Sequence, residues 1–274
     1  MAISNFIPTI WSENLISSLN NQYVGVANCN RDYEGEIKQR GSSVKICDIG
    51  DIAIGDYTKD TDMNIPQELS DSLVELIIDK AKYFNFQVDD VDKTQCSPKL
   101  LETAMRKAAN ALSNEADRYV YSLHTEAAHE LSICAPGDNL IEYILKAKEI
   151  LYRNNVSNPD DVVIELSPEV ATQLILDQMD NFSFNNDILT SGCIGSIAGS
   201  KVFVSNNVVR ESERIYHCVV RSKRAIAFAE QLSEIEAYRP EKRFADAVKG
   251  LHLYGAKVVH PNEIVRLTVD INNK

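Results

Sequence analysis

The hydrophobic pattern predicts strands in the first third of the chain. Apolar and polar residues alternate over 42–50 and again from residue 83, which predicts strands at 42–50 and 81–91 because successive side chains of a strand point to opposite faces. We predict another strand at 73–79, LVELIID. The stretch 51–72 between the first two strands is acidic, rich in turn residues and without a helical stripe. We therefore predict a long hairpin with a polar tip.

A hairpin of this length needs a surface to pack on, because two strands alone are marginally stable in water and long open edges invite pairing with other chains. The residues leave two alternatives open. The hairpin folds back onto the core of its own chain, or it lies against another molecule.

A long amphipathic helix is predicted over 97–130. Ser97 suits the N-cap and Pro98 the first helical position. Apolar residues then recur at steps of three and four, namely Leu101, Met105, Ala108, Leu112, Ala116, Tyr119 and Leu123. A helix of this length would reach roughly 50 Å.

The remainder alternates helices and strands with short connections, which indicates an α+β fold rather than a doubly wound sheet. We predict helices over 140–154, from Ser167 to about 179, and over 223–231. Strands are predicted at 162–166, 201–205, 215–221, 235–240, 244–261 and 263–270.

Composition and charge exclude several classes of protein. The chain has 274 residues, 44% hydrophobic and 25% charged residues, as in folded globular proteins. Its net charge of −12, concentrated in the first third, disfavours non-specific nucleic-acid binding. We see no secretory signal and no apolar run long enough to span a bilayer. None of the six cysteines forms a C-x-x-C motif, so we expect reduced and mostly buried thiols.

The aspartates after the third strand are the most conspicuous cluster of potential metal ligands. Asp89 and Asp90 would point to opposite faces of a regular strand, and Asp90 with Asp92 offers too few oxygens for a hard cation. We interpret them as solvated acids that end a strand.

The other candidate motifs are also weak. The glycine-rich stretch 191–201 fits no phosphate-binding pattern and precedes a strand, so we expect a turn with positive φ. The histidines show no metal or catalytic spacing. The basic clusters, which we expect to form a solvated face or ion pairs between chains, are Arg221, Lys223 and Arg224, and Arg239, Lys242 and Arg243. We predict no catalytic residue, no cofactor and no metal.

The order of these elements resembles the major capsid (coat) proteins of tailed bacteriophages, which have the Hong Kong phage capsid fold. The stretches that carry the resemblance are MAISNFIPTIWSENL at the start, NRDYEGEIKQRGSSVKI at 30–46, DYTKDTD at 56–62, AKYFNFQVDDVDKTQ at 81–95, VIELSPEV at 163–170, GSIAGSKVFVSNNV at 195–208 and AVKGLHLYGAKVVHP at 247–261. Each is weak alone, but their order covers essentially the whole chain.

The resemblance implies an α+β phage capsid fold with an N-terminal arm, an extended β-hairpin loop, a long spine helix in a peripheral domain and a mixed α/β axial domain. The expected parts are the arm 1–30, the hairpin loop with its flanking peripheral strands 31–92, the peripheral domain with the spine helix 93–138, the axial domain 139–239, the peripheral return strand 240–262 and a C-terminal strand 263–274.

The resemblance also implies partners. The subunit would assemble with copies of itself, as hexamers and pentamers, into an icosahedral shell around double-stranded DNA that it does not read by sequence. The hairpin would reach over a neighbouring subunit. With the spine helix starting near residue 97, no long scaffolding segment fits before it, so a separate scaffolding protein and a portal are expected. The location would be the virion capsid, assembled in the cytoplasm of a bacterial host, without membrane contact.

The residues expected to contact neighbouring subunits are Asp48, Asp51, Asp56, Lys59, Asp60, Asp62, Arg221, Lys223 and Arg224. Two alternatives share the same fold, the shell of a bacterial nanocompartment and the capsid of a gene transfer agent. A cytosolic α/β enzyme is a further alternative, and it would require a convergent titratable cluster in a pocket.

Overall fold

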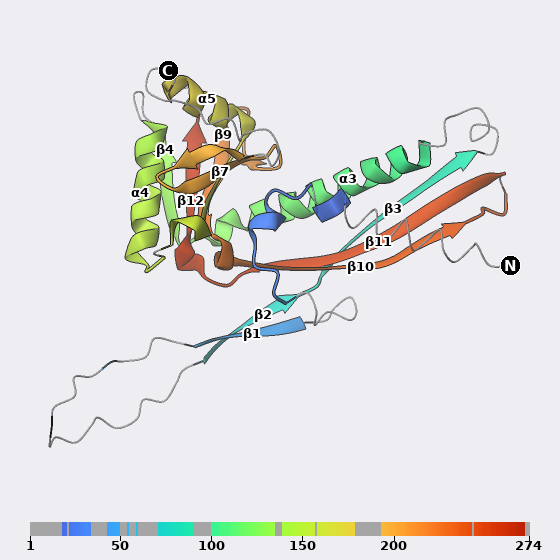
Figure 1. Ribbon diagram of the computed structural model, residues 1–274, viewed down its shortest axis with the longest axis horizontal. Coiled ribbons are helices and arrows are strands. Elements are labelled where there is room, and N and C mark those ends of the chain that lie inside the picture. The colour runs from blue at the N-terminus through green and yellow to red at the C-terminus, as the bar shows by residue number, and fades with distance from the viewer. Residues whose placement is uncertain are drawn as a thin grey trace.

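The computed structural model of the chain describes residues 18–20, 22–33, 43–49, 54, 59, 71–89, 100–134, 139–156, 158–178, 193–242 and 244–271. Figure 1 shows an elongated molecule. A seven-stranded sheet with two helices forms one end, a long three-stranded sheet with helix α3 extends from it, and the hairpin β1–β2 lies on the other side of the three-stranded sheet.

The seven-stranded sheet gathers strands from four separate stretches of the chain. Its order is β4 (His129–Ile133), β12 (Ile264–Asp270), β9 (Ile215–Ser222), β5 (Val162–Leu166), β7 (Ser200–Val204) and β6 (Cys193–Ile197), and β8 (Val209–Arg210) also pairs with β9. Strand β5 reads VVIEL and is buried throughout, as expected for a strand inside a sheet covered by helices. Helices α4 (Leu140–Arg153) and α5 (Pro168–Gln178) pack against this sheet and complete its core.

Two of the predicted helix starts are confirmed by their caps. The Asn139 side chain accepts a hydrogen bond from the Ile141 backbone N–H at 3.0 Å, and the Ser167 hydroxyl accepts one from the Val170 N–H at 3.2 Å. Both satisfy backbone donors of the first turn that have no partner within the helix.

The three-stranded sheet is antiparallel in the order β10 (Ile226–Tyr238), β11 (Ala245–Val258) and β3 (Lys80–Asp89). Helix α3 (Leu100–Ser122) covers one face, where Phe84 and Phe86 lie as their alternation predicts. A Cβ on Gly250, which faces Phe84 across the ladder, would lie 2.4 Å from the Phe84 ring. The ring therefore covers the glycine, and this packing is possible only because residue 250 has no side chain.

The hairpin is formed by β1 (Ser43–Ile49) and β2 (Asp71–Ile77), paired in antiparallel register from Ser43 with Ile77 to Ile49 with Asp71. Its base packs on its own chain. The buried side chains of this contact are Val44, Ile46, Leu76 and Ile78 of the hairpin with Ala227, Ala229 and Leu253 of the three-stranded sheet. Because neighbours along a strand alternate in direction and Phe228 faces α3, the hairpin lies on the opposite face of that sheet.

The crossing of the hairpin over the sheet depends on Gly255. A Cβ at this position would lie 2.3 Å from the backbone oxygen of Ile77, which is closer than a real Cβ contact. A residue without a side chain is therefore needed where the β2–β3 backbone passes over β11.

Several predictions from the sequence were wrong in detail. Residues 223–231 form a short 3-10 turn followed by β10, not a helix. The long helix ends at Ser122 and is followed by the 3-10 helix η3 (Leu123–Glu126) and by β4. Strand β6 was not predicted, and Ser97 and Pro98 lie outside the described residues.

The boundary predicted at residue 239 does not match the sheets. Strand β10 pairs with β11, which in turn pairs with β3, so β10 belongs with the three-stranded sheet. Strand β12, predicted as a separate C-terminal strand, lies between β4 and β9. Among the described residues, no helix combines the length and apolar character that a membrane crossing needs.

Candidate functional site: a strap held by buried acids, and exposed contact surfaces

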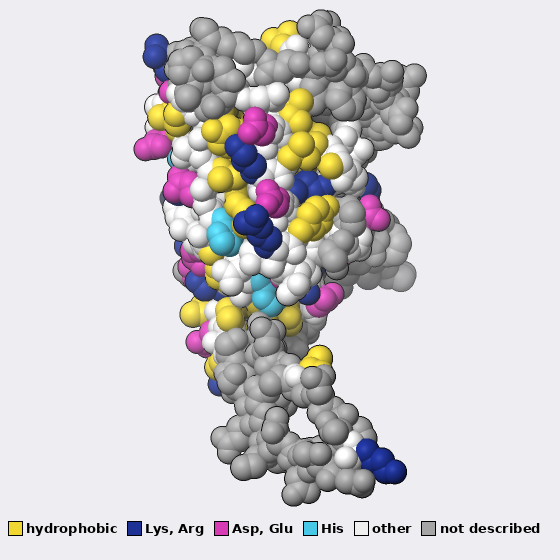
Figure 2. Space-filling view, turned by 90° about the vertical axis from the view of Figure 1, so that its left-hand side faces the viewer, with side chains coloured by type: hydrophobic (Ala, Val, Ile, Leu, Met, Phe, Trp, Pro, Cys, Tyr) yellow, Lys and Arg dark blue, Asp and Glu magenta, His cyan; other side chains and the backbone are white. Residues whose placement is uncertain are grey.

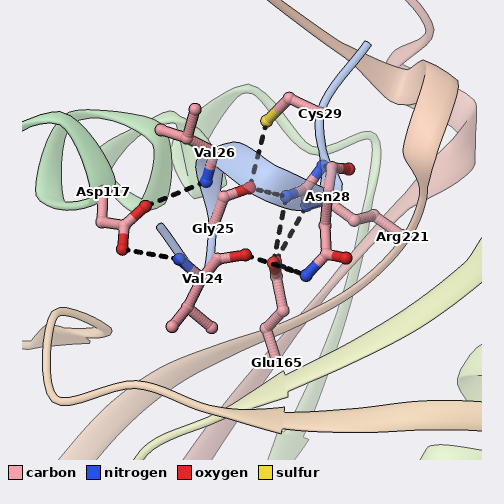
Figure 3. Close-up of polar contacts among 8 residues, drawn as sticks. All are labelled: Val24, Gly25, Val26, Asn28, Cys29, Asp117, Glu165 and Arg221. Carbon is pink, nitrogen blue, oxygen red and sulfur yellow. Dashed lines mark hydrogen bonds and ion pairs between the residues drawn. The ribbon is translucent and has the colours of Figure 1, made fainter. Parts of the chain in front are cut away.

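Residues 22–33, here called the strap, cross the region where the two sheets meet (Figure 3). Arg221 of β9, 1% exposed, makes two bonds to Glu165 of β5, from Nε to Oε2 at 2.9 Å and from Nη2 to Oε1 at 3.0 Å. The same guanidinium donates to the backbone oxygens of Asn28 at 2.8 Å and Gly25 at 2.9 Å. A buried ion pair of the seven-stranded sheet thus also binds the strap backbone.

Helix α3 holds the same part of the strap from another direction. The Asp117 carboxylate accepts from the backbone N–H groups of Val24 at 3.1 Å and Val26 at 2.9 Å. Burial raises the pKa of Asp117 to about 6, against the effect of these two donors. Gly25 lies against the Tyr121 ring, where a Cβ would come within 2.9 Å, so the strap approaches α3 closely only because this residue is glycine.

The three-stranded sheet provides a third anchor. Glu230 of β10 accepts from the Tyr23 hydroxyl at 2.5 Å, from Arg31 at 2.6 Å and from His252 Nε2, which lies 2.8 Å away. Asn30 adds two backbone bonds to β10, donating to Ile226 O and accepting from Phe228 N–H. Acids from α3, β5 and β10 therefore fix one short segment to the helix and to both sheets.

The residues predicted to contact neighbours are not all at the surface. Arg221 is buried and bonded within its own chain, so the prediction was wrong for this residue. Lys59 and Lys223 are exposed. Arg224 is ion-paired with Glu263 at 2.5 Å, although its side chain stays 59% exposed. Asp48 lies on β1, but the structure does not describe its side chain. Four further aspartates lie outside the described residues, namely Asp51, Asp56, Asp60 and Asp62.

No catalytic or metal centre emerges from the part of the chain that the structure describes. Asp89 is exposed at the end of β3, whereas Asp90 and Asp92 lie outside the described residues. No group of three or more potential ligands forms among the described residues. Two open depressions along β3, of about 250 and 530 Å³, hold no cluster of titratable groups such as an active site requires.

The glycine-rich stretch forms the turn between β6 and β7. Gly199 has φ 85° and Ala198 φ 49°, so the expected positive φ is confirmed. The buried Lys148 of α4 donates from Nζ to Ala198 O at 2.6 Å and fixes this turn against the helix.

The cysteines partly match the expectation. Cys29 and Cys218 are buried free thiols, and burial raises their pKa values to about 11 and about 12, while Cys134 is exposed. Neither buried thiol has the low pKa of a reactive nucleophile.

An exposed surface with apolar patches lies on the side of α4, which Figure 2 shows face on. Leu145 and Tyr152 of α4 and Leu176 of α5 are large apolar residues with 41 to 62% exposure. Between them, Glu142 pairs with Lys146 and Glu149 with Arg153 along the helix. Large exposed apolar side chains are compatible with a protein–protein contact at this surface.

Sequence reasoning missed the acids that hold the strap, although a signal was present. Glu165 stands inside the apolar run VVIEL, and Arg221 directly follows the apolar residues of IYHCVVR. Opposite charges within two buried strands are costly unless they pair, so their pairing could have been inferred. Asp117 lies beside the apolar stripe of the long helix, but nothing in the sequence points to the strap as its partner.

No protein-family model and no curated protein matches the chain. Among solved structures, a chain from Mycobacterium phage Che8 is similar over 92% of both chains, with 28% identity and a TM-score of 0.71. The capsid of Ralstonia phage GP4 is similar at 13% identity and TM-score 0.68, covering 92% of this chain and 90% of that one. The capsid of a native GTA particle is similar at 11% identity and TM-score 0.62, covering 85% and 86%.

The chain has the fold of the tailed-phage major capsid proteins, with the α+β composition that the sequence predicts. This likeness supports a structural role in a viral capsid. Among the described residues, the bonds of the buried network around Arg221 join parts of this one chain to one another.

Proposed function

We propose that the chain is the major capsid subunit of a tailed phage, which assembles as hexamers and pentamers into an icosahedral shell around double-stranded DNA. The observation that carries the proposal is the similarity to the phage Che8 chain over 92% of both chains, together with the capsid fold. The similarity covers nearly the whole of both chains, which supports a shared role for the fold as a whole.

The elongated form of the subunit supports this role. A long sheet, a hairpin on its far side and the apolar surface on α4 offer several separate contact surfaces (Figures 1 and 2). A standard protein interface buries ~1,600 Å², and several of moderate size add up to a stable shell. Closed symmetry keeps such contacts from growing into an open aggregate.

We assign some of these contacts to charged residues. In this proposal, the hairpin residues Asp48, Asp51, Asp56, Asp60 and Asp62 meet basic groups of a neighbour, and Lys59, Lys223 and Arg224 meet acidic groups. The exposure of Lys59 and Lys223 fits this assignment. Arg224 would have to exchange or share its bond to Glu263.

The proposed partners follow from the same role. A separate scaffolding protein and a portal would guide assembly in the cytoplasm of the host. The acidic chain, with net charge −12, would enclose DNA without gripping it, because DNA binding needs basic groups that displace counterions. We propose no catalytic role for this chain.

The capsid of a gene transfer agent is a second candidate, favoured by the similarity to the GTA capsid. It would use the same subunit contacts, so the content of purified particles separates it from a phage capsid. A nanocompartment shell would assemble without a scaffold.

The test is to express the full chain alone and with its candidate scaffolding protein, and to examine both by light scattering and negative-stain microscopy. We expect capsomer-sized rings, tubes or irregular shells from the chain alone and uniform shells with the scaffold. Uniform shells from the chain alone would favour the nanocompartment. A monomer under both conditions would refute the capsid role.

A further inference from the structure

Helix α4 has one face in the core and one face exposed. Its inner face packs into the core of the seven-stranded sheet through Ile144, Ala147 and Leu151. The exposed residues recur at steps of three and four and so form one stripe along the helix, namely Glu142, Leu145, Lys146, Glu149, Tyr152 and Arg153. In Figure 1, α4 lies at the outer edge of the molecule, where a second molecule can approach this stripe.

The stripe has an apolar side and a charged side. Leu145 and Tyr152, 45% and 41% exposed, are seven residues apart and therefore point in nearly the same direction. At 100° per residue, the four charged residues lie about 40–100° around the helix from Leu145, all on one side of the apolar pair. Figure 2 shows acidic and basic side chains alternating in a column on this face, with hydrophobic side chains beside them.

The charges along α4 are complementary to their own sequence read backwards. From the N-terminus they run Glu142, Lys146, Glu149 and Arg153, which is acid, base, acid, base. A two-fold axis perpendicular to the helix, passing between residues 147 and 148, would place Glu142 opposite Arg153 of a second copy. The same axis would place Lys146 opposite Glu149 of that copy. Every acid on the stripe would then meet a base.

The same antiparallel register also joins the apolar residues. Leu145 would lie two residues, or about 3 Å along the axis, from Tyr152 of the second copy, and the two-fold axis repeats this contact. Because such an axis brings the same side of both helices together, charged side meets charged side and apolar side meets apolar side. A parallel two-fold pair would instead set the charged side of one helix against the apolar side of the other.

We propose that α4 is a two-fold contact between two copies of this chain, with Leu145 and Tyr152 as its apolar centre and the four charged residues selecting the antiparallel register. Charged residues at an interface contribute specificity more than affinity. The face of one helix is smaller than a standard interface, so we expect a weak dimer with a Kd of about 10 µM or higher. The inference concerns the unassembled chain and holds whether or not the chain forms a shell.

The experiment is a charge-swap test on the full-length chain, by sedimentation velocity over a range of concentrations. Glu149→Lys would set two lysines, 146 and 149, against the same two residues of the second copy, and Lys146→Glu would do the same with two glutamates. A mixture of the two variants pairs lysines with glutamates at both places. Circular dichroism verifies that each variant is folded.

We expect each variant alone to dimerise at least about tenfold more weakly than the wild type, because like charges would face each other. In the mixture we expect dimers that contain one chain of each kind. The matched control is Glu236→Lys, the same charge change at an exposed residue of β10 that is paired with Lys249, and it should dimerise like the wild type.

The outer pair provides an independent second set of variants if the first set does not fold. Glu142→Arg and Arg153→Glu should each dimerise weakly alone and associate when mixed. A wild type that stays monomeric up to about 1 mM would overturn the proposal. So would variants that weaken association but do not recover it on mixing, because α4 would then meet a different surface of its neighbour. Dimers without shells would support this contact and count only against the capsid role.

Discussion

At the scale of single residues, Arg221 stands out because its charge is buried and its guanidinium is hydrogen-bonded to both a carboxylate and backbone carbonyls. It pairs with Glu165 and also binds the carbonyls of Gly25 and Asn28. Removing one member of a buried ion pair leaves the other charge without compensation, and such changes cost roughly 3–5 kcal/mol. We expect Arg221→Met to lower the free energy of unfolding by about that amount, measured by urea denaturation of the unassembled chain.

The matched control is Arg153→Met. Arg153 pairs with Glu149 at the surface of α4, with both side chains more than half exposed, and such pairs contribute about 0.3–0.5 kcal/mol. If the two variants were equally destabilised, the Arg221 network would not hold the fold in the way its geometry indicates.

At the scale of elements, two glycines of β11 position what packs on its two faces. At Gly255 an added Cβ would meet backbone of the hairpin, at Ile77 O, whereas at Gly250 it would meet the side chain of Phe84. A side chain can rotate away and a paired backbone cannot. We therefore expect Gly255→Ala to destabilise the chain more than Gly250→Ala, and to lower the protection of 43–49 and 71–78 in hydrogen exchange.

The comparison of these variants is its own control, because both place the same methyl group on the same strand. Gly250→Ala should lower protection on the α3 side of the sheet and leave the hairpin protected. Loss of hairpin protection in both variants would mean that Gly255 has no special part in the crossing.

The sequence predicts those elements that depend on local patterns, and it fails for those that depend on packing between distant parts of the chain. The strands 43–49 and 80–89 follow from alternation, and α4 and α5 begin at the capping residues that the sequence offers. Residues 223–231 are predicted as a helix, but Ile226 and Phe228 pack on the α3 side of the sheet, and Ala227 and Ala229 pack on the hairpin side. Tertiary packing overrode helix propensity there.

The end of α3 and strand β6 could not be predicted for a similar reason. HELSI at 129–133 continues an apolar spacing, yet it pairs with β12 from the far end of the chain. CIGSI at 193–197 contains a glycine that weakens a strand, and it is held by pairing with β7. The strap network joins residues nearly 200 positions apart, a distance over which periodicity carries no information.

At the scale of the whole molecule, the strap couples the two sheets. At the start of the strap, Tyr23 is bonded to Glu230 of the three-stranded sheet. The next residues, 24–28, are bonded to Asp117 of α3 and to Glu165 and Arg221 of the seven-stranded sheet. Asn30 and Arg31 then bond to β10 of the three-stranded sheet again. The anchors alternate, so the strap cannot leave one sheet without straining its bonds to the other.

If the strap binds as one unit, breaking one of its anchors should reduce the contribution of the next anchor to the free energy of unfolding. We expect Glu165→Gln and Glu230→Gln together to lower the free energy of unfolding by less than the sum of the single variants, with a coupling of about 1 kcal/mol or more. Urea denaturation of the four chains of this cycle measures the coupling. The control cycle combines Glu165→Gln with Glu149→Gln, an exposed change outside the strap, and should be additive. Additivity within about 0.5 kcal/mol in both cycles would mean that the two sheets are held together by their direct contacts and chain connections, with the strap only lying across them.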